Sequence, residues 1–291
     1  MDTLKQYMKL ISAGVCQLMK PGPFVCDLYC RDFPNTTLIE YFQMKVGDVV
    51  GYVARDDNRK AIVIVFRGAI TIESWSEIIK GVGPKQPFDP LDSSKGTVHF
   101  GFLEAYNAAK DHIGELLMKQ IMEHPGYEVE VLGWSYGGAM ASLNAMDLWN
   151  RLKIPAKKIV LVTFGQPRVG DQVYADWVDK SGILIKRLVH KNDIVPHLGP
   201  DFLGYRHHSA EIHTNALTGR TTQCVQPEDK ECSYGVPLAL LNAIDHFQNA
   251  YGVFMLGCSR DALVGQISQL KDILKLTSGV NGKVDDNNLF I

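Results

Sequence analysis

One short stretch, Tyr127–Gly138, constrains the fold more than any other part of the chain. It reads YEVEVLGWSYGG, so an alternating run rich in valine ends in Gly-x-Ser-x-Gly, and small residues at helical spacing follow. This order predicts a strand, a sharp turn and a helix, with Ser135 at the tip of the turn. A glycine on each side leaves room for the tight backbone. The pattern is typical of an acyl-transfer nucleophile; the ordinary alternative is a glycine-rich turn that carries an unremarkable serine.

The rest of the chain alternates predicted strands and helices, which favours one α/β domain over residues 1–291 with a mostly parallel sheet. Continuous apolar runs such as Ala61–Phe66 are typical of strands that are covered on both faces. We expect strands at 49–55, 60–66, 127–134, 159–164 and 183–189 and an edge strand at 209–214. The helices are expected at 2–20, 100–124, 137–152 and 237–251.

Composition excludes several classes of function. A net charge of −2 and the lack of a basic block give no reason to expect nucleic acid as a partner. No apolar run approaches membrane-spanning length, so no transmembrane segment is expected. The start of the chain has no signal-peptide pattern, which predicts either an intracellular protein or a processed secreted chain.

The six cysteines bear on that choice, because an even number suits disulfide bonds in a secreted protein. Six cysteines allow 15 pairings, and six buried thiols in an intracellular protein are the alternative. Zinc is not expected, since no cysteine or histidine spacing fits a ligand set. The cysteines are Cys16, Cys26, Cys30, Cys224, Cys232 and Cys258.

Two further segments carry candidate functional residues. Ile72, Trp75 and Ile79 share one face of a predicted helix that glycines follow, so the segment is either a lid over an apolar site or an ordinary surface helix. Asn35-Thr36-Thr37 is an N-glycosylation sequon, which matters only if the chain is secreted.

A serine nucleophile needs a base to take its proton and a carboxylate to orient that base. Asp193 follows a predicted strand and His246 lies further along the chain, so Ser135, Asp193 and His246 occur in the order that α/β-hydrolases use. Asp245 is a poor orienter by prediction, because neighbours in a helix point in different directions. The rival candidates are Asp201 as the acid and His190, His197, His207, His208 and His213 as the base.

With these residues in place, the chain resembles the class 3 lipases of the filamentous-fungal type, and especially the secreted triacylglycerol lipases of oil-degrading yeasts. The resemblance covers roughly residues 5–258. Its motifs, in order, are Phe66-Arg67-Gly68, Val98-His99-Phe100-Gly101-Phe102, the Ser135 turn, Phe164-Gly165-Gln166-Pro167-Arg168-Val169-Gly170, Asn192-Asp193-Ile194-Val195-Pro196, and Asp245-His246 with Tyr251.

The resemblance implies an α/β-hydrolase fold, a lid at about 70–85 and a C-terminal extension at about 259–291. It implies that the backbone N–H groups of Ala69 and Tyr136 form the oxyanion hole, and that the lid and Trp134 contact substrate. It implies disulfides Cys16–Cys258, Cys26–Cys30 and Cys224–Cys232. It further implies a secreted monomer that hydrolyses lipid esters at a lipid–water interface without a metal or organic cofactor.

Three positions depart from the family pattern. Trp134 and Tyr136 replace the usual His and Leu of Gly-His-Ser-Leu-Gly, and Ala69 replaces a Ser or Thr whose hydroxyl reinforces the oxyanion hole. We therefore expect weakened catalysis and a narrower acyl side of the site, because tyrosine is bulkier than leucine. The alternatives are an esterase of soluble, short-chain or feruloyl esters and a lipid-binding pseudo-enzyme.

Overall fold

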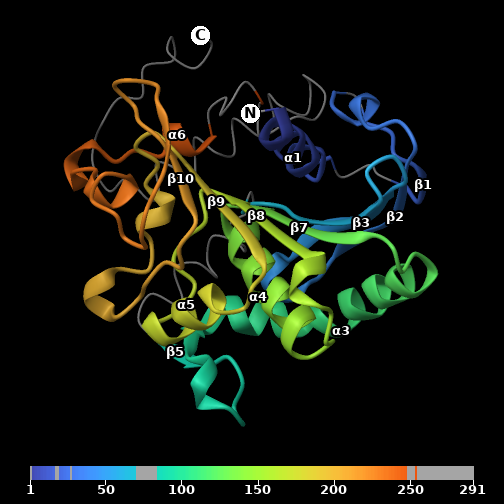
Figure 1. The fold of residues 1–291 in the computed structure, drawn as a ribbon, viewed down its shortest axis with the longest axis horizontal. Helices are drawn as coiled ribbons and strands as arrows, with labels where there is room; N and C mark the ends of the chain where they lie inside the picture. The colour runs from blue at the N-terminus through green and yellow to red at the C-terminus, as the bar shows by residue number, and fades with distance from the viewer. Residues whose placement is uncertain (1, 17–19, 27, 70–83, 248–252, 254–291) are drawn as a thin grey trace.

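The computed structural model describes residues 2–16, 20–26, 28–69, 84–247 and 253. Within them the main sheet has nine strands in the order β1-β2-β3-β4-β7-β8-β9-β10-β11 (Figure 1). Strands β4, β7, β8, β9 and β10 are mutually parallel, and the strands at both flanks are antiparallel. The bounds are β1 Gly22–Pro23, β2 Thr36–Gln43, β3 Val50–Asp56, β4 Ala61–Phe66, β7 Glu128–Trp134, β8 Ile159–Phe164, β9 Leu184–His190, β10 Glu211–Thr214 and β11 Thr221–Gln223.

Helices cover both faces of this sheet. Helix α1 lies on one face, while α3, α4 and α5 lie on the other (Figure 1). A small antiparallel pair, β5 (Lys85–Pro87) and β6 (Thr97–His99), precedes α3. The helices are α1 Asp2–Ala13, α3 Phe100–Glu123, α4 Tyr136–Asn150, α5 Gln172–Asp179 and α6 Ile244–Phe247. Short 3₁₀ turns lie at Cys30–Asp32, Val46–Asp48, Ser93–Lys95, Ala156–Lys158, Val195–His197, Asp201–Leu203, Ser233–Gly235 and Leu238–Leu240.

The central strands form where the sequence is continuously apolar. Every residue of β4 and β8 is buried, as expected for parallel strands between two layers of helices. Two hydrophobic cores result, one on each face of the sheet. The first holds Phe102, Ile113 and Met140 from α3 and α4, and the second holds Met8 and Ile11 from α1.

Helix α1 is shorter than predicted, because it ends at Ala13 and not near residue 20. The chain turns at Gly14, where a Cβ atom would lie 3.1 Å from the Val65 side chain. A polar contact also fixes the helix: the Tyr7 hydroxyl donates to Glu130 at 3.4 Å, and Arg59 pairs with the same carboxylate. Burial, together with the nearby Glu130 carboxylate, raises the pKa of Tyr7 to about 12. The helix is thus anchored over the start of β7.

Two other predictions were wrong in detail. The strand at 209–214 is not an edge strand, since β11 pairs along its outer side. The helix expected over 237–251 is replaced, within the described residues, by the turn Leu238–Leu240 and the four-residue helix α6. Between them Asn242 extends along residue 193 as an isolated parallel bridge. Its backbone N–H donates to Asn192 and its carbonyl accepts from Ile194, so a helix there would forfeit both bonds.

Two of the three predicted disulfides, Cys26–Cys30 and Cys224–Cys232, are present. The third involves Cys258, which lies outside the described residues, as do residues 70–83 of the predicted lid and the extension at 259–291. Lys85, the last residue assigned to the lid, already begins β5. None of the described helices has the length and apolar character needed to cross a membrane.

Candidate active site

Ser135 stands at a sharp turn between β7 and α4. Its φ of 59° and ψ of −128° lie in a region that residues with a side chain seldom occupy. The neighbouring glycines make the turn possible: a Cβ atom at Gly133 would lie 2.1 Å from the carbonyl oxygen of Gly137. A Cβ atom at Gly137 would lie 2.1 Å from the carbonyl oxygen of Phe66. The Gly-x-Ser-x-Gly spacing is therefore required by backbone contacts on both sides.

Asp193 and His246 are brought together although they lie 53 positions apart in the chain. The Nδ1 atom of His246 lies 2.8 Å from Oδ2 of Asp193, and both side chains are almost fully buried. The other carboxylate oxygen accepts the backbone N–H of Val195 at 2.8 Å. Because Nδ1 faces a carboxylate, it carries the proton in the neutral ring, which leaves Nε2 as the basic nitrogen.

Asp245 ties the segment that carries His246 to the loop that carries Asp193. Its Oδ2 accepts the backbone N–H of Asn192 at 3.2 Å and the side-chain amide of Asn242 at 2.9 Å. Both contacts are to residues other than His246, which agrees with the prediction that Asp245 does not orient the imidazole. Its role in joining the two segments was not foreseen, because the sequence does not reveal that Asn192 and Asn242 are adjacent.

Gly165 lies between the Ser135 turn and the Asp193–His246 pair and is in close contact with that pair. The backbone N–H of Ser135 donates to the carbonyl of Phe164, the residue before this glycine. A Cβ atom at Gly165 would lie 2.6 Å from Oδ2 of Asp193 and 2.7 Å from the His246 ring. The three predicted residues thus converge at the carboxyl ends of β7, β8 and β9, where open α/β sheets bind their ligands.

Trp134 packs behind His246. Its indole is 2% exposed and stacks on the imidazole with ring centroids 5.1 Å apart and an interplanar angle of 23°. The indole also lies against Gly68, where a Cβ atom would be 2.4 Å from Cε3. The indole therefore packs against the ring of the base, and the predicted contact of Trp134 with substrate stays a prediction.

Two polar atoms that could exchange a proton have no hydrogen-bond partner among the described residues. They are Oγ of Ser135 and Nε2 of His246, both buried. Ala69, the predicted oxyanion residue that follows Gly68, is 1% exposed. Ile72, Trp75 and Ile79 fall outside the described residues, so their predicted contact with substrate stays a prediction.

Three of the rival histidines, His207, His208 and His213, make hydrogen bonds elsewhere. Nε2 of His207 faces the carbonyl of Pro196 at 2.8 Å, and Nε2 of His213 faces the carbonyl of Lys191 at 2.9 Å. Burial lowers the pKa values of His190 and His197. Burial also lowers the pKa of His208 to about 3, with a further contribution from the Arg187 guanidinium. No hydrogen bond among the described residues joins any of these rings to Oγ of Ser135.

Two buried ion pairs, which sequence reasoning missed, support the loops beside the site. Arg168 pairs with Glu228 at 2.8 Å and donates to the carbonyls of His197 and Gly199, so it holds the loop after Asp193. Arg187 on β9 pairs with Glu211 on β10 at 2.8 Å. Such pairs join segments far apart in sequence, and no local pattern indicates them.

Within the described part of the chain, one group of side chains has metal-ligand types close together: Glu211, His213 and Cys232. The sulfur of Cys232 is bonded to Cys224. Glu211 is committed to Arg187 and to the backbone N–H of Ser233. These donors therefore do not fit a metal site.

The fold and the site together define a serine hydrolase of the α/β-hydrolase fold. The sheet is mixed with parallel centre strands, the serine lies at a strained strand–helix turn, and a buried Asp–His pair lies beside it. Residues 63–202 match the family model described as Lipase (class 3). A lipase of Rhizomucor miehei is 33% identical over 248 residues, which cover 84% of this chain and 67% of that protein. The chain belongs to the class 3 lipase family.

Other relatives agree with this assignment. A lipase of Rhizopus oryzae is 33% identical over 244 residues, and the match covers 83% of this chain but only 61% of that relative's length. A protein of Gibberella zeae named secreted mono- and diacylglycerol lipase 2 is 27% identical over 280 residues, covering 80% of this chain and 68% of that protein.

Solved structures give the same fold. A triacylglycerol lipase whose catalytic centre is described as a serine protease triad has a TM-score of 0.79 and 31% identity, covering 89% of this chain and 96% of that one. The Lip2 lipase of Yarrowia lipolytica has a TM-score of 0.75 and 32% identity, covering 89% and 95% of the two chains. The predicted fold and family are therefore confirmed.

Proposed function

We propose that this protein is a triacylglycerol lipase that works through an acyl-enzyme on Ser135. The observation that carries the proposal is the buried His246–Asp193 pair, with its 2.8 Å hydrogen bond, beside a strained serine turn. A carboxylate in this position fixes the imidazole and stabilises the imidazolium that forms during catalysis. The family, with relatives named as lipases, supports lipid esters as the substrate class.

In the proposed reaction Oγ of Ser135 attacks the ester carbonyl carbon while its proton passes to Nε2 of His246. The carbonyl oxygen becomes an oxyanion, for which the backbone N–H groups of Ala69 and Tyr136 are the proposed donors. The tetrahedral intermediate expels the alcohol, which takes the proton from His246. Water then attacks the acyl-serine with His246 as base, and the fatty acid leaves as Ser135 regains its proton.

Exposed apolar side chains on the loops of the acid and base support contact with a lipid surface. Ile194, next to Asp193, is 38% exposed, and Ile244, two residues before His246, is 44% exposed. Leu238 and Leu240 on the preceding turn are 79% and 56% exposed. Apolar groups of this size beside a site favour an apolar partner.

The primary test is Ser135→Ala, measured by titration of fatty acid released from emulsified triacylglycerol and by labelling with a fluorophosphonate. We expect both signals to vanish while the circular dichroism spectrum is unchanged. Ser142→Ala is the matched control, because Ser142 is a fully buried serine in α4 that contacts Tyr174 and not the site. Retained hydrolysis in Ser135→Ala would refute the assignment.

The esterase alternative differs in its response to substrate aggregation. A lipase should gain activity as a triacylglycerol passes its solubility limit and should prefer it to soluble esters such as methyl ferulate. An activity curve that stays flat across the solubility limit would favour an esterase. A folded protein that does not react with the fluorophosphonate at all would favour the lipid-binding pseudo-enzyme.

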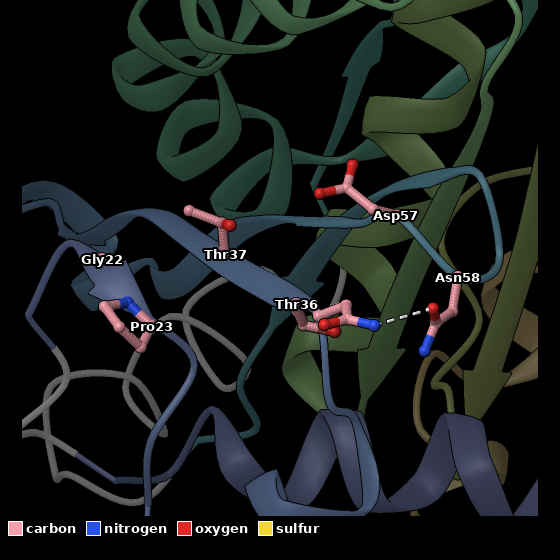
Figure 2. A pocket seen from close by; sticks show the side chains of 7 residues that line it. Gly22, Pro23, Thr36, Thr37, Asp57 and Asn58 are labelled. Atoms are coloured by element: carbon pink, nitrogen blue, oxygen red, sulfur yellow. Dashed lines mark hydrogen bonds between the residues drawn. The ribbon is translucent and has the colours of Figure 1, made fainter.

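We further propose that the protein is secreted as a monomer with an N-glycan on Asn35. Asn35 is exposed at the turn before β2, and its amide donates to Asn58 at 3.0 Å, the dashed bond in Figure 2. A hollow of about 540 Å³ lined by small and polar side chains adjoins it. Asn35 lies near the start of β4, at the end of the sheet opposite Ser135, so a glycan there would leave the active site open.

Expression in a secreting yeast tests this proposal. Thr37→Ala should abolish a mass shift on treatment with an N-glycanase, whereas Thr37→Ser, which keeps the sequon, should retain it.

The proposal also includes the Cys16–Cys258 bond, the lid at about 70–85 with Ile72, Trp75 and Ile79 against substrate, and the C-terminal extension at about 259–291. Peptide mapping under non-reducing conditions would test the disulfide.

A further inference from the structure

The 3₁₀ turn Val46–Asp48, between β2 and β3, contacts the two segments that carry the proposed oxyanion donors. The hydroxyl of Tyr136 donates to the carbonyl oxygen of Gly47 at 2.8 Å. Nη2 of Arg67, two residues before Ala69, pairs with Oδ2 of Asp48 at 3.2 Å. One turn therefore touches the residue of one donor and the chain just before the other.

The side chain of Tyr136 points toward the Val46–Asp48 turn and α3, and its predicted effect on the acyl side of the site stays a prediction. Its side chain is 1% exposed and packs edge-to-face on Phe102 of α3, with ring centroids 5.8 Å apart. A buried phenol needs a hydrogen-bond acceptor, and the Gly47 carbonyl supplies one. Because Tyr136 is the first residue of α4, this bond restrains the peptide that carries its N–H.

The turn is itself firmly placed. Gly47 has a φ of 68° and Asp48 a φ of 46°, both in the left-handed region. A Cβ atom at Gly47 would lie 2.3 Å from the Cβ of Ala105, so the turn is already in close contact with α3. The Gly47 carbonyl can therefore serve as a fixed point for the Tyr136 hydroxyl.

The second connection is also buried. The side chain of Arg67 is 1% exposed and that of Asp48 is 10% exposed. The backbone N–H of Arg67 donates to Val50 at 2.9 Å, and Gln43 donates to the other oxygen of Asp48 at 3.2 Å. These bonds hold the end of β4 against the same turn.

We propose that Tyr136, through its side chain, and Asp48 are positioning residues that hold the two oxyanion donors at a fixed separation. This inference rests on the proposed function. Backbone donors stabilise an oxyanion only when they are preorganised to within about 0.5 Å of the required geometry. Ala69 has no hydroxyl that could add a third donor, so the placement of the two N–H groups matters more here.

Tyr136→Phe tests the inference, because it removes the hydroxyl and keeps the ring on Phe102. We expect kcat for p-nitrophenyl butyrate to fall by roughly tenfold with KM within about twofold of the wild type, a partial loss compared with the removal of a donor. The rate of fluorophosphonate labelling should fall by a similar factor. Tyr174→Phe is the matched control: it removes a buried hydroxyl bonded to Ser142 at 3.1 Å and should lower Tm without lowering kcat.

A thiono analogue of the same ester separates positioning from general destabilisation. Sulfur accepts hydrogen bonds poorly, so the wild type should prefer the oxygen ester strongly, and this preference should shrink in Tyr136→Phe and in Asp48→Asn. A lowered Tm with unchanged kcat and unchanged oxygen-to-sulfur preference would overturn the inference. The proposed function fails separately, if the wild type is not labelled at Ser135.

Discussion

At the residue scale, the proposed site depends on small residues, glycine and alanine, as much as on the side chains that do chemistry. Gly133 and Gly137 allow the Ser135 turn, and Gly165 allows Asp193 and His246 to meet beneath it. Ala69 is a different case, because a hydroxyl at this position would add a donor to the proposed oxyanion hole. The chain therefore keeps the two backbone donors and lacks the side-chain donor.

Ala69→Ser should raise kcat, because the added hydroxyl can donate to the oxyanion. The loss of one such donor costs roughly 2.7–4 kcal/mol where it has been measured, which sets an upper bound on the gain. We expect an increase of about tenfold on a soluble ester, with Ala69→Thr in the same direction. Turnover by purified variants at matched active-site concentration, counted with a fluorophosphonate, is the measurement. Equal kcat in all three proteins would show that the missing hydroxyl is not a deficit.

At the scale of elements, β7, β8 and β9 deliver the nucleophile, the Gly165 loop and the acid to one edge of the sheet. The base arrives differently, on the four-residue helix α6, which Asn242 and Asp245 join to the acid loop. Position in this part of the molecule is set by loop-to-loop hydrogen bonds. One added atom in these loop contacts should therefore displace the side chains of the acid and the base.

Gly165→Ala provides such a change. Gly165 has a φ of 54°, and the new Cβ would lie 2.6 Å from Asp193, so the Asp193–His246 pair must move. A displacement of about 1 Å can cost on the order of 10²-fold in rate, and we expect kcat to fall by at least that factor. The assay is initial-rate hydrolysis of a soluble ester.

Gly182→Ala is the control for backbone strain. Gly182 also has a positive φ, of 77°, but its Cβ would meet nothing closer than 3.7 Å. Both variants should lose about 1–2 kcal/mol of stability from the left-handed conformation, while only Gly165→Ala should lose activity. Similar rates for the two variants would contradict the geometry described for the site.

The sequence predicted the elements whose signal is local. The apolar runs of β4 and β8 and the glycines around Ser135 were sufficient to predict these elements. Chain order pointed to Asp193 and His246, two side chains that lie 2.8 Å apart in the structure. The predictions failed where the deciding partner is distant. Residues 237–243 read as helical by periodicity, but hydrogen bonds to Asn192 and Ile194 hold Asn242 in an extended conformation. The direction of the Tyr136 side chain likewise depends on Gly47, 89 positions earlier.

At the scale of the whole molecule, buried titratable side chains beside the sheet make the free energy of unfolding depend on pH. His207 and His208 follow one another and are both buried. Burial lowers the pKa of His207 well below its ordinary value, and the Arg187 guanidinium contributes in the same direction. For His208 the same two causes lower the pKa to about 3. Both rings therefore stay neutral in the folded protein at mildly acidic pH.

Stability should consequently fall on acidification. Below about pH 6.5 the unfolded chain binds protons at these histidines and the folded chain does not, so the free energy of unfolding decreases as pH falls toward 3. The expected slope is about 1.4 kcal/mol per pH unit for each histidine. Urea unfolding at pH 7.0, 6.0 and 5.0 measures it.

His208→Gln isolates one of the two contributions, because glutamine does not titrate. Its unfolding free energy should vary less steeply between pH 6.5 and 5.0 than that of the wild type. The comparison avoids the range near pH 4, where protons would bind to Glu211 and Glu228 in the unfolded chain. In the folded protein the pKa values of these two carboxyls are lowered: burial acts to raise them, but Arg187 and Arg168 outweigh it. Identical slopes in the two proteins would show that His208 is protonated in the folded state.

The contact between Gly68 and Trp134 also limits the order in which this chain can change. A side chain at residue 68 would meet the indole at 2.4 Å, so that position cannot accept one while tryptophan remains. A small residue at position 134 removes these contacts, although it also removes the stacking on His246. The two positions are therefore epistatic: a library that varies residue 68 alone would find no active variants, whereas one that varies both together opens a route that single steps cannot reach.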